Sequence, residues 1–419
     1  MRVTSPARRT GSLSVAVALP VMLAIACTEA DQRSRTYVVR DSSEVRVVQN
    51  VAPLWGDDDA WQIAEVPSVE IGDASGEGLG VFSEVAGVVR LSDGRIVVGD
   101  GASATLRFFD ARGTALGSRG GRGEGPGEYQ ELSQISIVSG DSIVVMDAVL
   151  QRVTVLGPDG VFVRSAQLSA AQIGGYATPH GLLEGGSILV SVSELATSLG
   201  SGLQRRSASL LAVDLETGKV NRLASILGPQ EILEGSRSIG YLFGVDTEVA
   251  TSASEILLMS TDQAVVTKLG IDGETKLIFS WPVESKAVTQ ELLTMAMEER
   301  IANFPAGVST RTIERLRERR LDETVAPHLP SARSLTVDAN NNVWVESFPV
   351  PGEGQASYLI FRPDGVWLGS LALPDGLKRG TVPQFDPAME IGDGYILGVW
   401  VDELGVEFVR EYQLKRGSP

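Results

Sequence analysis

The strongest constraint on the fold is a strand-and-turn pattern that recurs six times along the chain. Each copy starts with a tight polar turn and continues into a short strand rich in β-branched residues. The six segments are 93–98, 140–145, 185–190, 254–258, 341–345 and 393–397. A short apolar segment precedes each one, and an alternating strand follows. Alternation between Gly, Asp and Asn turns indicates antiparallel strands joined by hairpins, and such a repeat determines the whole architecture.

A second hairpin turn, followed by a fourth strand, completes five of the six copies. These turns are 111–113, 158–160, 216–218, 272–273 and 363–365. The sixth copy ends with its third strand, Val406 to Leu414, and the segment Glu65 to Ile71 has the length and alternation to supply the missing strand. Ring closure of this kind removes exposed sheet edges. We therefore predict an all-β, six-bladed β-propeller of four-stranded antiparallel blades, closed by an N-terminal strand.

A glycine-rich segment between the first two copies carries a resemblance to a known family. Residues 120–129 read Gly-Gly-Arg-Gly-Glu-Gly-Pro-Gly-Glu-Tyr. This run resembles the blade-linking motif of bacterial lipoproteins of the six-bladed β-propeller family, relatives of the NHL-repeat propellers. The resemblance covers about Glu65 to Leu414, although the linker decays in the later blades. It implies the propeller fold but brings little information about activity.

The N-terminus has the features of an export signal. Three arginines precede an apolar run from Leu13 to Ala26, which is too short to span a membrane. Cys27 is the single cysteine, and Leu23 to Cys27 resembles a lipobox. We expect residues 1–26 to be a lipoprotein signal peptide and Cys27 to carry the lipid. Residues 27–60 are expected to form a polar tether, with room for one added strand in the alternating stretch Tyr37 to Val48. The alternative is an ordinary signal peptide and a soluble periplasmic protein.

The predicted location follows from the same segment and from composition. Thr28 after the cysteine favours the outer membrane over the inner one, by resemblance to other lipoprotein signals. The expected partner is therefore the membrane, through an N-terminal lipid anchor on an exported, cell-envelope protein. A formal net charge of −17 disfavours nucleic acid as a partner.

Three insertions in the propeller, residues 61–419, are expected on one face of the ring. With the strands of each blade called A to D, the insertions are the B-to-C loops 194–207 and 349–357 and the D-to-A link 283–332. These loops and links open on the same face of the ring, here called the inserted face. Insertions that lie on one face of a repeat protein often mark its binding face.

The longest insertion, residues 285–326, is predicted to be a helical hairpin between blades four and five. Thr289 can cap the first helix, and apolar residues then recur at helical spacing as far as Ile301. The second helix starts at about Thr310 and is rich in arginine. It can act as a lid or a basic contact patch, or it can be a solvated face with local ion pairs.

The first residues of each strand A are expected at the mouth of the central channel. The predicted ligand-binding positions are Glu84, Gln134, His180, Asp246, Arg333 and Asp386. Mixed polar residues of this kind suit a small polar ligand or a cation, although a channel of solvated side chains would look the same.

The chain lacks the sequence motifs of most enzyme classes. Two histidines and one cysteine exclude a three-histidine zinc site and a thiolate cluster. The glycine run 117–127 matches neither a dinucleotide-binding motif nor a P-loop. We name no catalytic residue and predict no cofactor.

Three hypotheses for function remain. The first is a lipid-anchored envelope propeller that acts as a scaffold, binding a protein or a small polar ligand on the inserted face. The second is a lactonase-like hydrolase that would hold a divalent cation at the channel mouth, with Glu84, Asp246 and Asp386 as conceivable ligands. The third is a purely structural surface protein.

Overall fold

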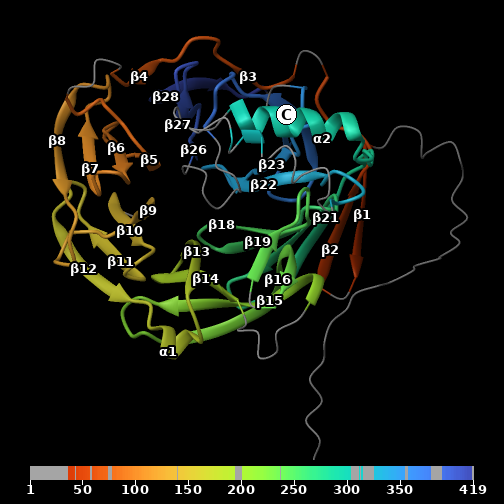
Figure 1. Ribbon diagram of the computed structural model, residues 1–419, viewed down its shortest axis with the longest axis horizontal. Helices are drawn as coiled ribbons and strands as arrows, with labels where there is room; N and C mark the ends of the chain where they lie inside the picture. The colour runs from red at the N-terminus through yellow and green to blue at the C-terminus, as the bar shows by residue number, and fades with distance from the viewer. Residues whose placement is uncertain are drawn as a thin grey trace, which may run out of the picture. The chain divides into compact units, whose positions relative to one another are not determined.

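Six antiparallel sheets form a ring in the computed structural model (Figure 1). The chain divides into two compact units, Met1–Arg35 and Thr36–Pro419, and the ring belongs to the second. The structure describes residues 36–42, 44–56, 59–73, 78–138, 140–193, 201–235, 237–302, 311, 313–314, 325–353, 357–378 and 389–417. The predicted signal peptide and Cys27 lie outside these residues.

Blades 1 to 3 follow one another along the chain, each with its first strand innermost (Figure 1). Blade 1 contains β5 (Val85–Arg90), β6 (Ile96–Asp100), β7 (Thr105–Phe109) and β8 (Ala115–Gly120). Blade 2 contains β9 (Leu132–Val138), β10 (Ser142–Asp147), β11 (Arg152–Leu156) and β12 (Phe162–Gln167). Blade 3 contains β13 (Ala177–Leu183), β14 (Ser187–Ser193), β15 (Ser201–Asp214), β16 (Val220–Glu234) and a fifth strand, β17 (Arg237–Gly240).

Blades 4 to 6 complete the ring and include strands from the N-terminal segment. Blade 4 contains β18 (Thr247–Thr251), β19 (Glu255–Ser260), β20 (Val265–Gly270) and β21 (Thr275–Ser280), with β2 (Val45–Asn50) and β1 (Tyr37–Ser42) added outside. Blade 5 contains β22 (Ala332–Val337), β23 (Val343–Ser347), β24 (Ser357–Phe361) and β25 (Trp367–Ala372). Blade 6 contains β26 (Glu390–Ile391), β27 (Tyr395–Val401) and β28 (Glu407–Lys415), completed by β3 (Gln62–Ile63) and β4 (Val69–Ile71).

The predicted closure by an N-terminal strand is confirmed. Strand β4 pairs antiparallel with β28 from Val69 opposite Glu411 to Ile71 opposite Val409. Strand β3 extends the same edge, with Ile63 opposite Leu414. The closing strand is thus two short strands, separated by a break that includes Pro67, which has no backbone N–H to donate to a ladder.

The segment predicted as a tether is in part a component of the ring. Strand β2 pairs parallel with β21, and the Nδ2 of Asn50 donates to the carbonyl of Gly365 in blade 5 at 3.0 Å. The backbone N–H groups of Leu54 and Trp55 then donate to β25. We call residues 36–71 the N-terminal belt, since its described parts run along the outer strands of blades 4, 5 and 6. The tether expected over residues 27–60, with one added strand, is therefore two strands and further edge contacts over residues 37–55, because the outer edges of blades 4 and 5 offer backbone groups for pairing.

The core consists of apolar layers between neighbouring blades. Leu106 and Phe108 of blade 1, for example, share a cluster of buried side chains with Ile135 and Val145 of blade 2. Four of the five turn glycines, all but Gly218, also lie close to the preceding blade. Gly365 has a φ of 84°, and a Cβ there would lie 2.8 Å from Cβ of Phe279. The Asp-Gly turn is therefore needed both for its backbone conformation and for close blade packing.

The structure describes the first helix of the predicted hairpin, α2 (Gln290–Ala302). Thr289 caps it as expected, because its Oγ1 accepts the backbone N–H of Leu292 at 3.2 Å. The predicted second helix falls almost wholly outside the described residues. A short helix that we did not predict, α1 (Ala170–Ile173), lies between blades 2 and 3.

Candidate functional site

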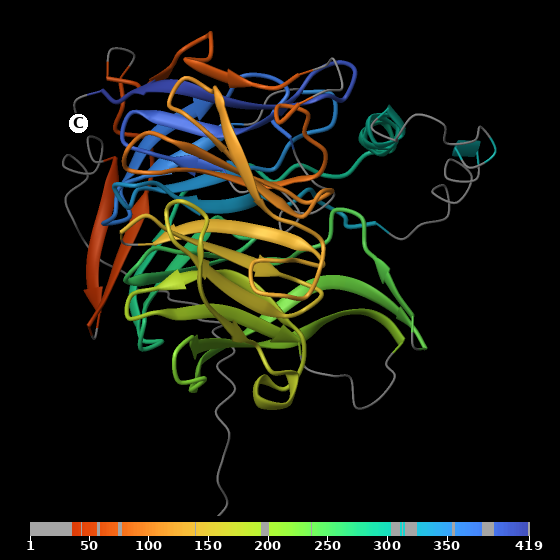
Figure 2. The same cartoon turned by 90° about the vertical axis from the view of Figure 1, so that its left-hand side faces the viewer.

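The helical insertion rests on a loop of blade 5 at the inserted face. Figure 2 shows α2 standing away from the ring on the same side as the extended ends of β15 and β16. Glu299 of α2 accepts the backbone N–H of Gly352 at 2.7 Å, and Lys286 pairs with Glu353 at 2.9 Å. These contacts join the insertion between blades 4 and 5 to the B-to-C insertion of blade 5.

The link between blades 3 and 4 joins the same assembly. Leu242 forms a parallel bridge with Val325, and the hydroxyl of Tyr241 donates to the carbonyl of Val325 at 2.8 Å. The rings of Phe243 and Phe348 pack edge to face, with their centroids 5.9 Å apart. We call this assembly the platform; its described residues are 241–246, 286–302, 325–329 and 348–353.

An arginine that the sequence analysis missed connects blade 3 to blade 4 beside the platform. Arg205 lies on the extension of β15, and its guanidinium donates to the carbonyls of Gly228 and Leu227 at 2.8 and 3.0 Å. Its Nη2 also donates to Oγ1 of Thr247 in blade 4 at 2.8 Å. Burial lowers the pKa of Arg205, and the nearby Asp246 opposes that change. The insertion length was the only sequence signal for this contact.

Asp246, one of the predicted mouth residues, lies directly before β18. Its backbone N–H donates to Oγ1 of Thr261 at 2.9 Å, and its carboxylate accepts the backbone N–H of Thr247 at 2.7 Å. Burial raises its pKa, while that hydrogen bond and the charge of Arg205 lower it. The structure thus brings a predicted acidic residue together with an unpredicted basic one at the edge between blades 3 and 4.

His180 lies within strand β13, where the register to β14 shifts. Its Nε2 is 2.8 Å from Oγ of Ser191 on β14. Burial lowers the pKa of His180 to about 4, so that the imidazole is neutral at pH 7. Such a ring can either donate to or accept from a hydroxyl.

Arg333 is turned into blade 5. Its guanidinium lies 3.2 Å from the carboxylate of Glu346 on the adjacent strand, and both side chains are buried, with exposures of 9% and 1%. The hydroxyl of Ser334 donates to the same carboxylate at 2.6 Å. This arrangement holds strands A and B of blade 5 together at their ends on the inserted face.

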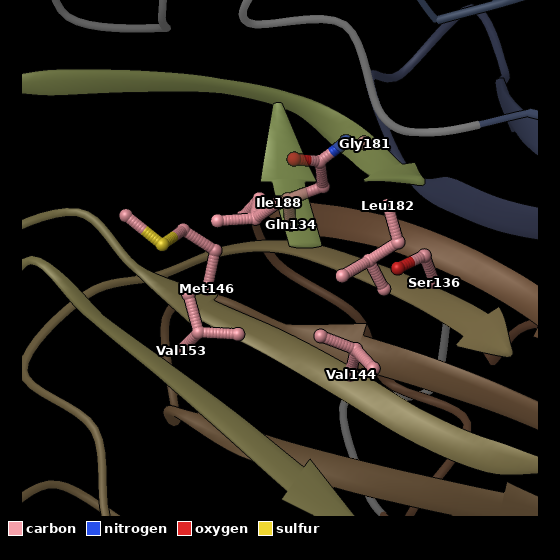
Figure 3. Close-up of a pocket in the computed structure, with 8 residues that line it drawn as sticks. All are labelled: Gln134, Ser136, Val144, Met146, Val153, Gly181, Leu182 and Ile188. Carbon is pink, nitrogen blue, oxygen red and sulfur yellow. The ribbon is translucent and has the colours of Figure 1, made fainter. Parts of the chain in front are cut away.

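The remaining predicted positions serve blade contacts or lie outside the described residues. Glu84 has an exposed side chain, and its backbone N–H donates to Glu407 at 3.2 Å across the seam between blades 1 and 6. Gln134 is half-buried and lines a small cavity between blades 2 and 3, with room for about one water molecule (Figure 3). Asp386 is not among the described residues.

Within the described ranges, no group of three or more His, Cys, Asp or Glu residues is arranged to hold a metal ion. Glu84 and Asp246 thus belong to no such group, and Asp386 lies outside the described residues.

The ring of six sheets, each built around four antiparallel blade strands and closed by an N-terminal strand, defines the class of protein: a six-bladed β-propeller. Residues 83–173 match a family model described as 6-bladed beta-propeller. This match confirms the resemblance to bacterial six-bladed propeller proteins that the glycine-rich linker indicated. Among curated proteins, none matches this sequence.

Solved structures share the fold at low identity. A member of the DUF4221 family from Bacteroides vulgatus ATCC 8482 is 9% identical, with coverage of 86% of this chain and 100% of its own, at a TM-score of 0.52. A candidate exported protein from Bacteroides fragilis NCTC 9343 is 12% identical, with 89% and 100% covered and a TM-score of 0.49. The calcium-binding protein regucalcin from Agrobacterium tumefaciens C58 is 13% identical, with 88% and 97% covered and a TM-score of 0.37. At these identities the likeness concerns the fold alone.

Proposed function

We propose that this protein is a binding propeller of the cell envelope that holds a partner protein on the platform of its inserted face. One observation carries the proposal: the insertion between blades 4 and 5, the B-to-C insertion of blade 5 and the link between blades 3 and 4 are joined by direct contacts into one assembly. Met295 on α2 and Leu203 on β15 are exposed to 38% and 47% and provide apolar contact area on the inserted face. Exposed apolar residues set among polar ones are typical of protein interfaces.

Site-specific photo-crosslinking in the native envelope tests this proposal. We expect a crosslinker at Met295 or Leu203 to capture one protein reproducibly. A crosslinker at Leu116, which is 57% exposed on the outer strand of blade 1, is the matched control and is expected not to capture that protein. Equal capture from all three positions would contradict a binding role for the platform.

We further propose that the protein is exported and anchored by a lipid on Cys27, in the outer membrane. The support is the sequence alone: the signal-like N-terminus, the lipobox-like residues before Cys27, and Thr28 after it. No helix among the described residues is long and apolar enough to cross a bilayer. Cys27→Ser is expected to release the protein from membranes, since a lipid anchor depends on the acylated residue. Continued membrane association of this variant, after export, would contradict the anchor.

A further inference from the structure

The N-terminal belt begins on the side of the ring opposite the platform. In blade 5, strand β24 starts after the insertion that carries platform residues 348–353 and ends at the turn 362–366. Its two ends separate the inserted face from a second face, formed by the A-to-B and C-to-D turns and here called the turn face. Figure 2 shows β1 and β2, in red, on the side of the ring away from α2.

Asn50 fastens the belt beside a turn of blade 5. Its side chain is buried, with an exposure of 4%. Its Nδ2 donates to the carbonyls of Ser280, at the end of β21, and of Gly365, in the turn of blade 5, both at 3.0 Å. Its Oδ1 accepts the backbone N–H of Trp367 at 2.9 Å. Loss of this amide would leave buried backbone groups without a partner, so attachment of the belt depends on Asn50.

Thr36 is the point at which the described chain joins the belt. The backbone N–H groups of Val51 and Ala52 donate to its carbonyl at 2.8 and 3.1 Å. The next residue, Tyr37, pairs with Asn50 in the ladder of β1 and β2. The belt therefore starts at a fixed place, close to the turn that Asn50 contacts.

The chain between Cys27 and this fixed place is short. It contains nine peptide units, from Cys27 to Thr36. Nine residues span at most about 30 Å when fully extended, and a flexible chain of this length has a root-mean-square span of about 17 Å. Strand β15 runs from the inserted face to the turn of blade 3 and has 14 residues, which correspond to about 43 Å of strand. A lipid on Cys27 would therefore stay near the turn face.

Given the lipid anchor on Cys27 proposed above, on which this inference rests, we propose that the belt orients the ring on the membrane. The turn face is directed towards the bilayer and the platform into the aqueous space. This orientation defines the kind of partner that the platform fits, which is a protein with its binding surface outside the bilayer.

The opposite orientation would place the inserted face against lipid. The insertion of that face contains five arginines between residues 311 and 320, and basic segments are attracted to anionic lipid. The chain as a whole carries a net charge of −17, which opposes adhesion to such lipid. The span of the chain before Thr36 decides between the two orientations, because it is shorter than the strand that separates the faces.

The test measures energy transfer from single sites on the protein to acceptor dyes on lipid headgroups. The purified lipoprotein is added to vesicles of phosphatidylethanolamine and phosphatidylglycerol, so that the arginine-rich insertion meets anionic lipid. A donor dye is attached to an azide-bearing residue, which is introduced at one position at a time. Ala111 and Glu216 are exposed positions in turns of blades 1 and 3, and Tyr176 and Leu404 are exposed positions on the inserted face.

We expect energy transfer from the two positions on the turn face to exceed that from the two on the inserted face by about twofold or more, given the separation of the faces. A flexible insert of about 30 residues directly before Thr36 raises the root-mean-square span of the tether to about 34 Å. This insert should abolish the difference between the faces without changing the ring.

Release of the belt should have the same effect as a longer tether. Asn50→Ala removes the three hydrogen bonds at the turn of blade 5 and should reduce the difference between the faces. Gln49→Ala is the matched control, since Gln49 is the exposed neighbour on β2, and it should leave the difference unchanged. The insert before Thr36 keeps the test valid if Asn50→Ala does not fold.

Three results would overturn the proposal. Equal transfer from both faces of the parent protein would show that the ring turns freely on its tether. Higher transfer from the inserted face would assign the lipid contact to that face. An unchanged difference after the insert would show that tether length does not set the orientation.

Flotation with the vesicles distinguishes these results from failure of the anchor itself. A protein that does not float lacks the proposed lipid. Its orientation is then measured after the thiol of Cys27, the only cysteine in the sequence, has been coupled to a maleimide-bearing lipid. The same four donor positions and the same three results then apply.

Discussion

The Nε2 of His180 lies 2.8 Å from Oγ of Ser191, across the two inner strands of blade 3. Burial places the pKa of this imidazole at about 4, below the value of about 6.5 for an unfolded chain. As the pH falls, the unfolded chain therefore takes up its proton first. The pair contributes its full stability above about pH 6.5 and loses it as the pH falls towards 4.

This relationship predicts an acid-sensitive contribution to stability. Between pH 6.5 and 4, His180 should account for a loss on the order of 1–3 kcal/mol in the free energy of unfolding. His180→Gln keeps a polar group near Ser191 but cannot take up a proton, so its stability should change less over the same range. Denaturant unfolding at several pH values measures this difference. Parallel curves for the two proteins would contradict the assignment.

The link between blades 3 and 4 should depend on Arg205. Arg205→Ala removes donors to Gly228, Leu227 and Thr247, and the acceptors on Gly228 and Thr247 are half-buried while Leu227 is exposed. We expect a loss of about 1–3 kcal/mol and faster hydrogen exchange in the extension of β15. Arg119→Ala is the matched control, since the exposed Arg119 donates, within the part of the chain that the structure describes, to the carbonyl of its neighbour Ser118 alone. If both variants unfold at the same denaturant concentration as the parent, the link has no energetic role.

Ring closure should be sensitive to the buried side of β4. Ile71 has an exposure of 4% and packs in the core between blades 6 and 1. Ile71→Ala should therefore cost about 2–4 kcal/mol. Val66→Ala lies in the same segment at an exposure of 73% and should change stability by less than about 0.5 kcal/mol. Deletion of residues 65–71 should destabilise the ring further, and an unchanged melting temperature would refute closure by this strand.

The turn glycines allow backbone strain and blade contact to be separated. Gly365→Ala introduces a Cβ at a positive φ and 2.8 Å from Phe279. Gly218→Ala has a similar φ of 70°, but no atom lies within 4 Å of the added Cβ. Positive φ costs about 1 kcal/mol in both, and the contact should make Gly365→Ala clearly worse. Equal melting temperatures would show that the blades adjust to the extra atom.

Local sequence signals predicted much of the fold. Turns such as Asp364-Gly365 and the alternation around them determine hairpins within a few residues, and Thr289 determined where α2 begins. The belt was not predictable in the same way. Strand β2 pairs with residues more than 200 positions away, and an alternating pattern identifies a strand without identifying the edge that it joins.

The candidate site was likewise predictable from the sequence only in part. Counting along strand A predicts Asp246 and His180 near the channel mouth, which stays a prediction; the structure has Asp246 directly before β18 and His180 within β13. Their chemical partners, Arg205 and Ser191, came only from the structure. The sequence by itself determined the number of blades, the closing segment and the face that carries the insertions. Tertiary structure decided which side chains meet and which edges the belt joins, since those contacts join segments whose mutual approach depends on packing of the whole ring.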